Sequence, residues 1–244
     1  MSLFAKQDVA VDLGASRVRL LVRGRGIVLD ESVSELVDSA AFTDAGRRLT
    51  ALCRAAFKRA QVRTGLFSTV RVVATVPSSI DEVGKRIVEE ALHAAGCRRV
   101  FLLESPMAAA IGAGEPVSEA RASAVVDIGF SRIQVAVISL AGNVIVQESL
   151  LGPQTDASAL SGRIADLVRS VLSGCLAKGR YNLADDVARG GLVLTGGGAM
   201  TPGLAEALKD ELDLPIRQVD KPDRCVIEGA GVVLTELDLL CRTR

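Results

Sequence analysis

The sequence predicts an α/β fold with two related domains, each a mixed sheet flanked by helices. The main observation is a repeat, because the heptapeptide Asp12–Val18 returns in similar form as Asp127–Ile133. Each copy lies between two short apolar runs, so the same strand-turn-strand unit occurs once near the start of each half. Strand-like and helix-like runs then alternate along both halves, a pattern typical of α/β proteins. We therefore expect one domain over residues 1–115 and a second over 116–244.

In the first half, apolar runs predict strands and apolar residues at helical spacing predict helices. The strands are expected at 8–13, 17–23, 26–30, 70–76 and 100–103. The helices are expected at 49–60, at 82–95 with Val83 in its apolar stripe, and from Pro106 to Gly112 or Gly114. Ser79–Glu82 has the pattern of a capping box at the start of the second helix. Residues 31–43 are polar and show neither period.

The second half starts again with the same order of elements. Its strands are expected at 123–129, 132–140, 144–150, 191–195 and 216–219, with a hairpin turn at 141–143. Its helices are expected at 160–175, at 203–212 and from Val226 toward the end of the chain. An internal duplication of this kind is typical of proteins that hold a ligand in a cleft between their halves.

The composition excludes several classes of protein. Hydrophobic residues make up 49% of the 244 residues, which is enough for a sizeable core, and the formal net charge is zero. No strong field therefore favours nucleic acid, and 3% aromatic residues argue against a surface that stacks bases. No stretch has the pattern of a signal peptide or the length of a membrane span.

Cysteine and histidine give no sign of a metal site. The cysteines are widely spaced and odd in number, without a C-x-x-C pair, so we expect reduced core residues of a cytosolic protein. They are Cys53, Cys97, Cys175, Cys225 and Cys241. The lone His93 has neither a partner histidine nor the pattern of a catalytic triad, so we interpret it as structural and expect no metal cluster.

Each copy of the repeat combines a carboxylate at the end of a strand with a glycine turn that carries a hydroxyl. Such a turn aims backbone N–H groups and a side-chain donor at a phosphate, so two facing copies would clamp a polyphosphate. A run of three glycines, 196–198, follows another expected strand, where missing Cβ atoms let the backbone lie flat against a ligand. An ordinary glycine-rich turn is the alternative for that run.

Several segments resemble the MreB family of bacterial actin-like proteins. They are 24–29, 76–91, 104–114, 125–129, 135–140 and 194–199, and the block from 70 to 140 is nearly free of gaps. The resemblance implies an actin-like fold of the actin, Hsp70 and sugar-kinase superfamily, with ATP and Mg²⁺ between two halves. It also implies ATP-driven filaments at the inner face of the cell membrane that guide wall synthesis.

The resemblance also implies a set of nucleotide-binding residues. The two turns of the repeat would hold the phosphates, and the segment L-T-G-G-G-A and the methionine after it would hold the nucleoside. By position, the phosphate residues are Asp12, Gly14, Ala15, Ser16, Arg17, Asp127, Gly129, Phe130, Ser131 and Arg132. The nucleoside residues are Gly196, Gly197, Gly198, Ala199 and Met200.

This sequence departs from the family pattern at the phosphate turns and at the hydrolytic residue. Ala15 and Arg17 stand where the family has Thr and Asn, and Phe130-Ser131-Arg132 replaces a glycine run followed by Thr-Thr. Gly84 stands where the family has its hydrolytic Glu. A glycine cannot orient a water molecule with a side chain, so we expect little or no ATPase activity, weak ATP binding at most, and no catalytic residue.

Arg17 and Arg132 occupy equivalent places in the two turns, and their role stays open at this point. A guanidinium binds phosphate through two parallel hydrogen bonds, so the pair could replace the metal and the lost hydroxyls. Alternatively, each arginine pairs with a carboxylate. The bulk of Phe130, where a glycine would let the backbone approach phosphate, favours the second interpretation.

The chain is also shorter than full-length members of the family. The family inserts one small subdomain at the place of 31–43 and another at the place of 151–160, so both are expected to be reduced or absent here. Leu66-Phe67 is an apolar pair on a polar loop, at a place where some family members insert a loop into the membrane. Packing of this pair under its own loop is the alternative.

These observations favour an MreB-like scaffold of cell shape and wall synthesis with a degenerate nucleotide site. Its expected partners are itself or a full-length MreB-type protein, and wall-synthesis or membrane proteins, with no nucleic acid. The expected location is the cytoplasm, with peripheral attachment to the inner face of the cell membrane as an option. The alternatives are an active Mg-ATP-dependent filament protein and a peptide-binding actin-like adaptor of cell division or pilus assembly.

Overall fold

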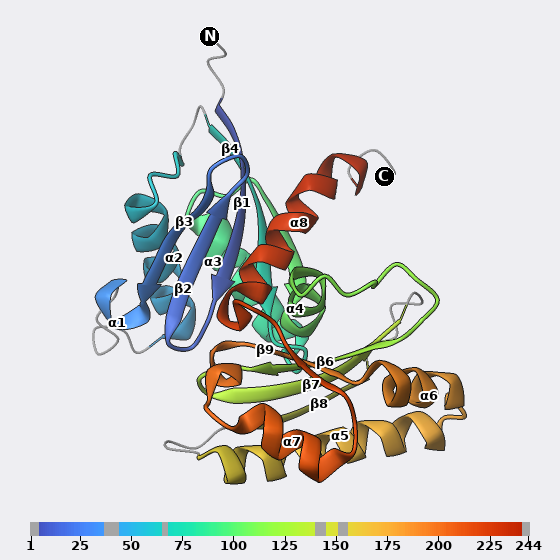
Figure 1. Cartoon of the computed structure of the whole chain (residues 1–244). Coiled ribbons are helices and arrows are strands. Elements are labelled where there is room, and N and C mark those ends of the chain that lie inside the picture. Colours follow the sequence, from blue (N-terminus) through green and yellow to red (C-terminus); the bar gives the residue numbers. More distant parts are fainter. Residues whose placement is uncertain (1–4, 37–43, 65–67, 140–144, 151–155, 241–244) are drawn as a thin grey trace. The chain divides into compact units, whose positions relative to one another are not determined.

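The computed structural model describes residues 5–36, 44–64, 68–139, 145–150 and 156–240 (Figure 1). The chain divides into two compact units. Unit 1 consists of Met1–Glu104 together with Ala230–Arg244, and unit 2 consists of Ser105–Gly229. Because the C-terminal segment belongs to unit 1, this division by contacts differs from the division by homologous halves at 115/116, which stays a prediction.

Unit 1 contains a five-stranded mixed sheet in the order β3-β2-β1-β4-β5. The strands are β1 (Ala5–Leu13), β2 (Arg17–Val22), β3 (Gly26–Ser32), β4 (Ser68–Val76) and β5 (Arg99–Glu104). The first three are antiparallel neighbours, while β4 and β5 run parallel to β1. All five expected strands are therefore confirmed, with ends that differ by one or two residues or, at the start of β1, by three.

Helices α2 (Ala45–Arg59) and α3 (Glu82–Ala94) cover one face of this sheet. The core between them contains buried Leu20 and Val72 of the sheet, Phe57 of α2 and Leu92 of α3. A short helix, α1 (Val33–Leu36), precedes α2 in a segment that the sequence pattern left unassigned. Both expected helices are confirmed.

The start of α3 differs from the prediction. The N-cap is Asp81, whose side chain accepts a hydrogen bond from the backbone N–H of Gly84, and the expected capping box from Ser79 is wrong. Ser79 lies in a turn that the N–H of Ile80 closes on the carbonyl of Pro77, so it precedes the cap. Val83 is 67% exposed, so it is not part of the apolar stripe.

Unit 2 repeats the topology of the first sheet, in the order β10-β9-β6-β7-β8. The strands are β6 (Ser123–Ile128), β7 (Arg132–Ile138), β8 (Ile145–Leu150), β9 (Leu192–Thr195) and β10 (Ile216–Gln218). The hairpin β6-β7-β8 is antiparallel, and β9 and β10 are parallel to β6. The match of both sheets, strand for strand, confirms the internal duplication as two mixed-sheet halves.

The helices of unit 2 are mostly those that the sequence predicts. They are α4 (Ser105–Gly112), α5 (Ala157–Ala177), α6 (Tyr181–Gly190), α7 (Leu204–Leu212) and the start of α8 (Cys225–Leu240), with short 3-10 turns η2 (Gly197–Met200) and η3 (Pro222–Arg224). The sequence pattern missed α6. That helix buries only Leu183 and Val187, and its N-cap makes no side-chain hydrogen bond.

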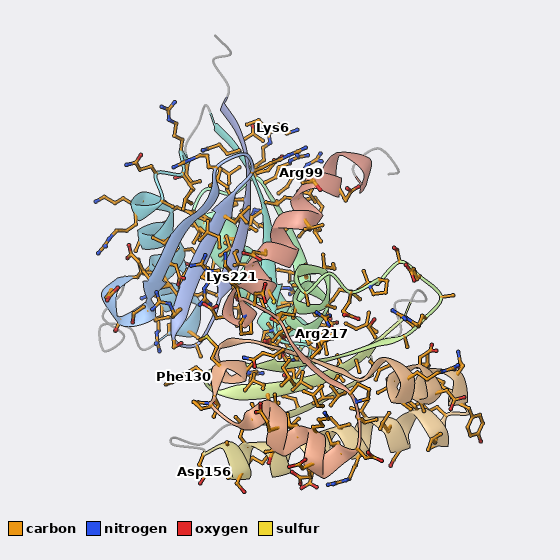
Figure 2. The ribbon with its side chains drawn as sticks, viewed as in Figure 1. Lys6, Arg99, Phe130, Asp156, Arg217 and Lys221 are labelled. Carbon is orange, nitrogen blue, oxygen red and sulfur yellow. The ribbon has the colours of Figure 1, made fainter. Side chains whose placement is uncertain are left out.

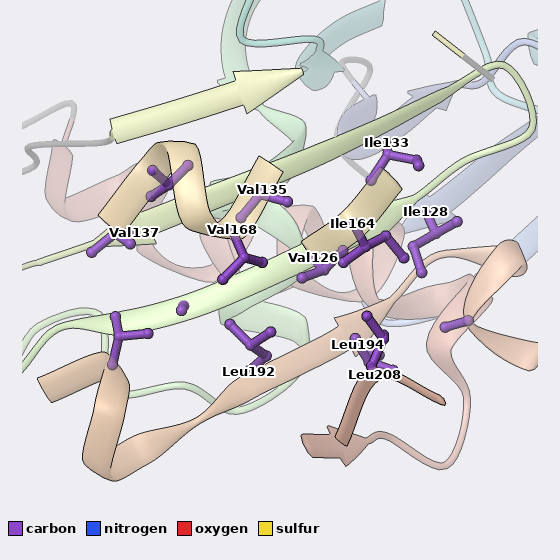
Figure 3. Close-up of a cluster of buried hydrophobic side chains, with 14 of the residues drawn as sticks. Val126, Ile128, Ile133, Val135, Val137, Ile164, Val168, Leu192, Leu194 and Leu208 are labelled. Carbon is purple, nitrogen blue, oxygen red and sulfur yellow. The ribbon is translucent and has the colours of Figure 1, made fainter. Parts of the chain in front are cut away.

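The core of unit 2 lies between its sheet and helices α5 and α7 (Figure 3). Ile128, Val135 and Leu194 of the strands pack with Ile164 and Val168 of α5, and all five are buried. The long stripe expected for 160–175 faces this core, so that prediction is confirmed.

Helices α4 and α8 meet within unit 2 at a crossing that only glycine allows. A Cβ on Gly229 would lie 1.8 Å from the carbonyl oxygen of Ala108, and one on Gly112 would lie 1.9 Å from that of Cys225. Real Cβ atoms do not approach backbone so closely, so both glycines are required by packing.

Four of the five cysteines lie in the described part of the chain, where they are buried and form no disulfide. Burial raises the pKa of Cys53, Cys97 and Cys225 to about 12, so these thiols stay protonated in the core. Cys241 lies outside the described residues. No described helix has the length and hydropathy needed to span a membrane.

Candidate functional site

The first phosphate-type turn follows Asp12, which belongs to a row of polar residues that crosses the sheet of unit 1. In strand register, Thr75 of β4 is opposite Asp12 of β1, Asp12 is opposite Arg19 of β2, and Arg19 is opposite Asp30 of β3. The Thr75 hydroxyl donates a hydrogen bond of 2.9 Å to Oδ1 of Asp12. Arg19 lies between two carboxylates, 3.8 Å from Oδ2 of Asp12 and 3.3 Å from Oδ1 of Asp30.

Unit 2 contains the same row at the same place in its sheet. Thr195 of β9 is opposite Asp127 of β6, Asp127 is opposite Gln134 of β7, and Gln134 is opposite Glu148 of β8. Gln134 donates to Oε2 of Glu148 at 3.1 Å. The two rows, named here the polar ladders, show that the duplication extends from the turns to four register positions in each sheet.

The arginine of each turn is bound to the last carboxylate of its own ladder. Nε of Arg17 donates to Oδ1 of Asp30 at 2.6 Å, and Nη2 donates to the backbone carbonyl of Asp30 at 2.7 Å. Nη1 of Arg132 donates to Oε1 of Glu148 at 2.5 Å. Both guanidinium groups therefore pair with a carboxylate two strands away from the aspartate of the repeat, Asp12 or Asp127, which is the second of the two roles considered for them.

Burial and charge act in opposite directions on the two aspartates of the first ladder. Burial raises the pKa of Asp12 above its ordinary value, against the Thr75 hydrogen bond and the Arg19 charge. Burial also acts to raise the pKa of Asp30, but the hydrogen bond from Arg17 and the charges of Arg19 and Arg17 outweigh it and lower that pKa. The arginines of this turn and ladder therefore stabilise the ionised form of Asp30 more than that of Asp12.

The two turns retain some hydrogen-bonding groups that a phosphate could use. Within the described part of the chain, the hydroxyls of Ser16 and Ser131 have no hydrogen-bond partner. The N–H of Gly129 instead closes its own turn on the carbonyl of Arg132 at 2.9 Å. Phe130 is 77% exposed at the tip of this turn, so a large apolar side chain stands beside Ser131 (Figure 2).

The glycine run after β9 has packing reasons at two of its three positions. A Cβ on Gly196 would lie 2.4 Å from the carbonyl oxygen of Ile128, and its φ of 81° also favours glycine. A Cβ on Gly198 would lie 2.2 Å from Cγ2 of Ile128. Only Gly197 has open space, with no atom within 4 Å, so one residue of the run is left for close approach of a ligand.

The end of this segment combines one buried and one exposed residue. Ala199 is buried, and its carbonyl accepts a hydrogen bond of 2.9 Å from Gln218, whereas Met200 is 55% exposed. Because Gly196 lies against Asp127 and Ile128, the structure brings the glycine run and the second turn together inside unit 2.

We expect Gly198→Ala to lower the free energy of unfolding of unit 2 by about 1–3 kcal/mol, because the new methyl group overlaps Ile128. Gly197→Ala is the matched control and should stay within about 0.5 kcal/mol of the parent, since its Cβ enters open space. Urea denaturation of both variants measures this. Equal losses in both would mean that the run is constrained at Gly197 as well.

Gly84 lies in the first turn of α3, where its N–H is bound to the Asp81 cap at 2.7 Å. A Cβ at this position would lie 2.7 Å from Cγ1 of Ile80, so a larger residue requires Ile80 to move.

His93 lies near the end of the same helix, where its Nδ1 is 2.9 Å from the carbonyl oxygen of Cys97, which is a structural contact. Leu66 and Phe67 lie outside the described residues.

Sequence reasoning found the turns but missed the ladders. Among the described residues, no group of three or more His, Cys, Asp or Glu side chains is arranged to hold a metal ion. The missed residues are Thr75, Thr195, Arg19, Gln134, Asp30 and Glu148. One signal was present, because Arg19 and Gln134 both stand seven positions after the repeated aspartate, on the same face of the following strand.

Comparison with known proteins gives a consistent result. The family model described as MreB/Mbl protein matches residues 42–171 and 151–242. The cell shape-determining protein MreB of Escherichia coli is 28% identical over 327 aligned positions, which cover 95% of this chain and 94% of that protein. The cell shape-determining protein Mbl of Bacillus subtilis is 25% identical, with 98% of each chain covered.

The similarity to solved structures is one of fold. MreB5 of Spiroplasma citri bound to ADP superposes with a TM-score of 0.77 at 16% identity, covering 98% of this chain and 99% of that chain. The MamK double helical filament gives a TM-score of 0.69 at 13% identity, covering 95% of this chain and 99% of that chain. The two mixed-sheet halves therefore form an actin-like fold.

The alignment also accounts for the short chain. The Escherichia coli protein aligns over 327 positions, whereas this chain has 244 residues, so the relative carries insertions that are missing here. Residues 37–44 are all that connects α1 to α2, and residues 151–156 are all that connects β8 to α5. Connections of this length hold no subdomain, in agreement with the expected shortening at both places.

Proposed function

This chain belongs to the MreB/Mbl family, and on that premise we propose that it is a cytoskeletal scaffold of cell shape and wall synthesis with a weakened nucleotide site. The relatives named above are cell shape-determining proteins, which supports the cytoskeletal part of the proposal. The weakened site is supported by one observation above all. Arg17 and Arg132, the two cations of the phosphate-type turns, are bound to Asp30 and Glu148.

The groups present fit a nucleotide poorly. The Ser16 and Ser131 hydroxyls and the open backbone at Gly197 are suitable for phosphate or nucleoside, and MreB5 of Spiroplasma citri binds ADP and AMPPNP. Against this, a hydrogen bond from a charged donor to phosphate contributes about 1.5–3 kcal/mol. Withholding two such donors weakens binding by about a thousandfold at 1.4 kcal/mol per decade.

The groups present also fit Mg²⁺ and hydrolysis poorly. Oδ1 of Asp12 already accepts a hydrogen bond from Thr75, and Oδ2 lies 3.8 Å from the Arg19 guanidinium, so both oxygens of this carboxylate already face protein groups. Gly84 has no side chain to orient water, and Ile80 crowds the space that a longer residue would need. We therefore assign no catalytic residue and propose that the scaffold role does not depend on ATP hydrolysis.

The proposal extends to partners and location. MamK is a filament-forming relative in fold, which supports association of this chain with itself or with a full-length MreB-type protein. Leu66-Phe67 is the proposed membrane contact, and it would place the protein at the inner face of the cell membrane. Two apolar side chains contribute about 1.5–3 kcal/mol each, so stable attachment requires several chains acting together.

The first experiment is a calorimetric titration of ATP, with and without Mg²⁺, into the purified protein. We expect no micromolar binding of ATP in either condition, in keeping with the loss of about a thousandfold derived above. Asp30→Asn/Glu148→Gln should strengthen binding by about tenfold, because this variant releases both arginines from their carboxylates.

Micromolar binding by the parent protein that Arg17→Ala/Arg132→Ala abolishes would contradict the proposal and show that the arginines bind phosphate. Phosphate release at a steady rate would instead support the active Mg-ATP-dependent filament protein.

A further inference from the structure

Unit 1 contains a positively charged pocket at the end of its sheet where β1 and β4 begin. The pocket has a volume of about 960 Å³ and is lined in part by Arg25, Arg54, Lys58 and Arg63. The other lining residues are uncharged, so none of them is Asp or Glu. Four cations therefore share one hollow of the described surface without a carboxylate among them.

The cations come from separate parts of the chain that the fold brings together. Arg25 lies in the β2–β3 turn, Arg54 and Lys58 lie in the second half of α2, and Arg63 lies in the loop after that helix. Gln7 of β1 fixes this loop, because its Oε1 accepts a hydrogen bond of 2.8 Å from the backbone N–H of Arg63. The positions are thus held by the sheet and by α2.

The ends of the neighbouring helices do not require these charges. At the end of α2, the N–H groups of Gln61 and Val62 bond the carbonyls of Lys58 and Phe57, and Gln61 adopts a left-handed φ of 54°. The end of α3 has the same hydrogen bonds. The N–H of Gly96 donates to the carbonyl of His93, and the N–H of Cys97 donates to that of Leu92. Both ends are therefore Schellman caps that satisfy their own carbonyls.

The charges of the pocket remain largely uncompensated by the protein. Arg54 donates to the carbonyl of Ala94 at 2.9 Å. Within the described part of the chain, the side chains of Arg25, Lys58 and Arg63 make no hydrogen bond or ion pair, and all three are exposed. Lys6 and Arg99 lie at the same end of the sheet and add to its positive potential (Figure 2).

We propose that this pocket binds a phosphate group carried by a small organic moiety. Guanidinium groups match the oxygens of phosphate through paired hydrogen bonds, and a lysine adds a point charge. The volume exceeds what phosphate alone occupies and falls within the range of small-molecule sites, so a glycerol- or sugar-sized substituent fits beside it. The same group exists in the headgroup of an anionic phospholipid and in soluble phosphate monoesters.

This inference is independent of the proposed nucleotide site, because none of the pocket residues belongs to the two turns or to the glycine run. The chain continues from Thr64, a lining residue, into Gly65-Leu66-Phe67, which makes a lipid headgroup one source to test. A failed pocket test leaves the nucleotide titration unchanged, so the two proposals fail separately.

The test compares two variants that lose the same number of charges from unit 1. The pocket variant is Arg25→Gln/Lys58→Gln/Arg63→Gln. The control variant is Arg47→Gln/Arg48→Gln/Arg86→Gln, whose residues are exposed near the starts of α2 and α3. Arg47 and Lys58 are eleven residues apart on α2, or about 16 Å along the axis, which exceeds the Debye length of about 8 Å in physiological salt.

One arm measures flotation with vesicles of phosphatidylcholine and phosphatidylglycerol, and with phosphatidylcholine alone. The other arm titrates glycerol 3-phosphate and inorganic phosphate by calorimetry. If the ligand is a lipid headgroup, the partition coefficient on anionic vesicles should fall about a hundredfold in the pocket variant and less than about threefold in the control.

If the ligand is soluble, the heat of glycerol 3-phosphate binding should disappear in the pocket variant and persist in the control. Failure of the parent protein to bind either probe would overturn the proposal. Equal losses in the two triple variants would overturn it as well, because they would show attraction by overall charge and not by this pocket.

Discussion

Gly229→Ala should prevent unit 2 from folding, the largest effect that we expect from any single methyl group in this protein. Its Cβ would lie 1.8 Å from the carbonyl oxygen of Ala108 and 2.8 Å from the backbone nitrogen of Gly112. The crossing is close at a second point as well, because a Cβ on Gly112 would lie 1.9 Å from the carbonyl oxygen of Cys225. The helices must separate by more than 1 Å, which removes the buried packing of Ala108 on α8.

The expected loss exceeds about 3 kcal/mol, the upper end of ordinary overpacking, and should appear as insoluble protein or a loss of cooperative unfolding. Gly174→Ala is the matched control, since Gly174 lies inside α5 with no atom within 4 Å of its Cβ. That change should raise stability by about 0.5–1 kcal/mol. Soluble yield and the circular dichroism melting curve distinguish the two, and a soluble Gly229→Ala protein with an unchanged melting temperature would contradict the close crossing.

Arg71→Ala should cost about 3–5 kcal/mol at pH 7, because it leaves the carboxylate of Asp8 buried without its main partner. Arg71 of β4 donates from Nε and Nη2 to the two oxygens of Asp8 at 2.7 and 2.5 Å, and the residues are only 5% and 7% exposed. Arg23 is 3.3 Å away but half exposed, so it compensates only in part. Arg98→Ala removes an exposed arginine from the same unit and should change stability by less than about 0.5 kcal/mol.

The pH dependence gives a second measurement of the same pair. Burial acts to raise the pKa of Asp8, but the hydrogen bonds and charge of Arg71, the hydrogen bond from Arg23 and the charge of Lys6 outweigh it and hold the pKa below its ordinary value. A lowered folded pKa means that the stabilisation is present above the unfolded value of about 3.9 and is lost as pH falls through the folded value. The urea midpoints of the parent and Arg71→Ala should therefore differ most near pH 7 and converge below pH 4. A constant difference over this range would show that Arg71 acts through packing alone.

Most of the fold could be predicted because apolar periodicity indicates the helices and strands, and the repeated heptapeptide indicates the two related halves. Strands β4, β6 and β7 are largely apolar, and α5 has a long apolar stripe. The exceptions have local causes. Helix α6 buries only two side chains, which gives a weak pattern, and α1 is a single turn. The cap of α3 was misplaced because a Pro77–Ile80 turn precedes it.

The candidate site could be predicted only as far as local sequence determines it. The turns were found from a repeated motif, but the carboxylate that binds Arg17 depends on register. Counting from the pair Val22 and Gly26 places Asp30 opposite Val18, on the core face. The pairing shifts between Leu20 and Leu21, and this irregularity brings Asp30 opposite Arg19. No periodicity rule reveals such a shift before the strands are paired.

The glycine run shows a different limit. Sequence alone favoured a ligand role for all three glycines, whereas Gly196 and Gly198 are required by contact with Ile128. Close packing between distant segments and close approach of a ligand both require glycine at a position. Only the structure therefore shows which of the two requirements applies.

The two polar ladders have a consequence for the internal repeat. Both halves carry an arginine at the same place in the turn, and each arginine pairs with an acidic residue of the outer antiparallel strand, Asp30 or Glu148. The repeat is therefore one of ion pairing as well as of topology, and each half holds the arginine of its own turn with a residue of its own sheet.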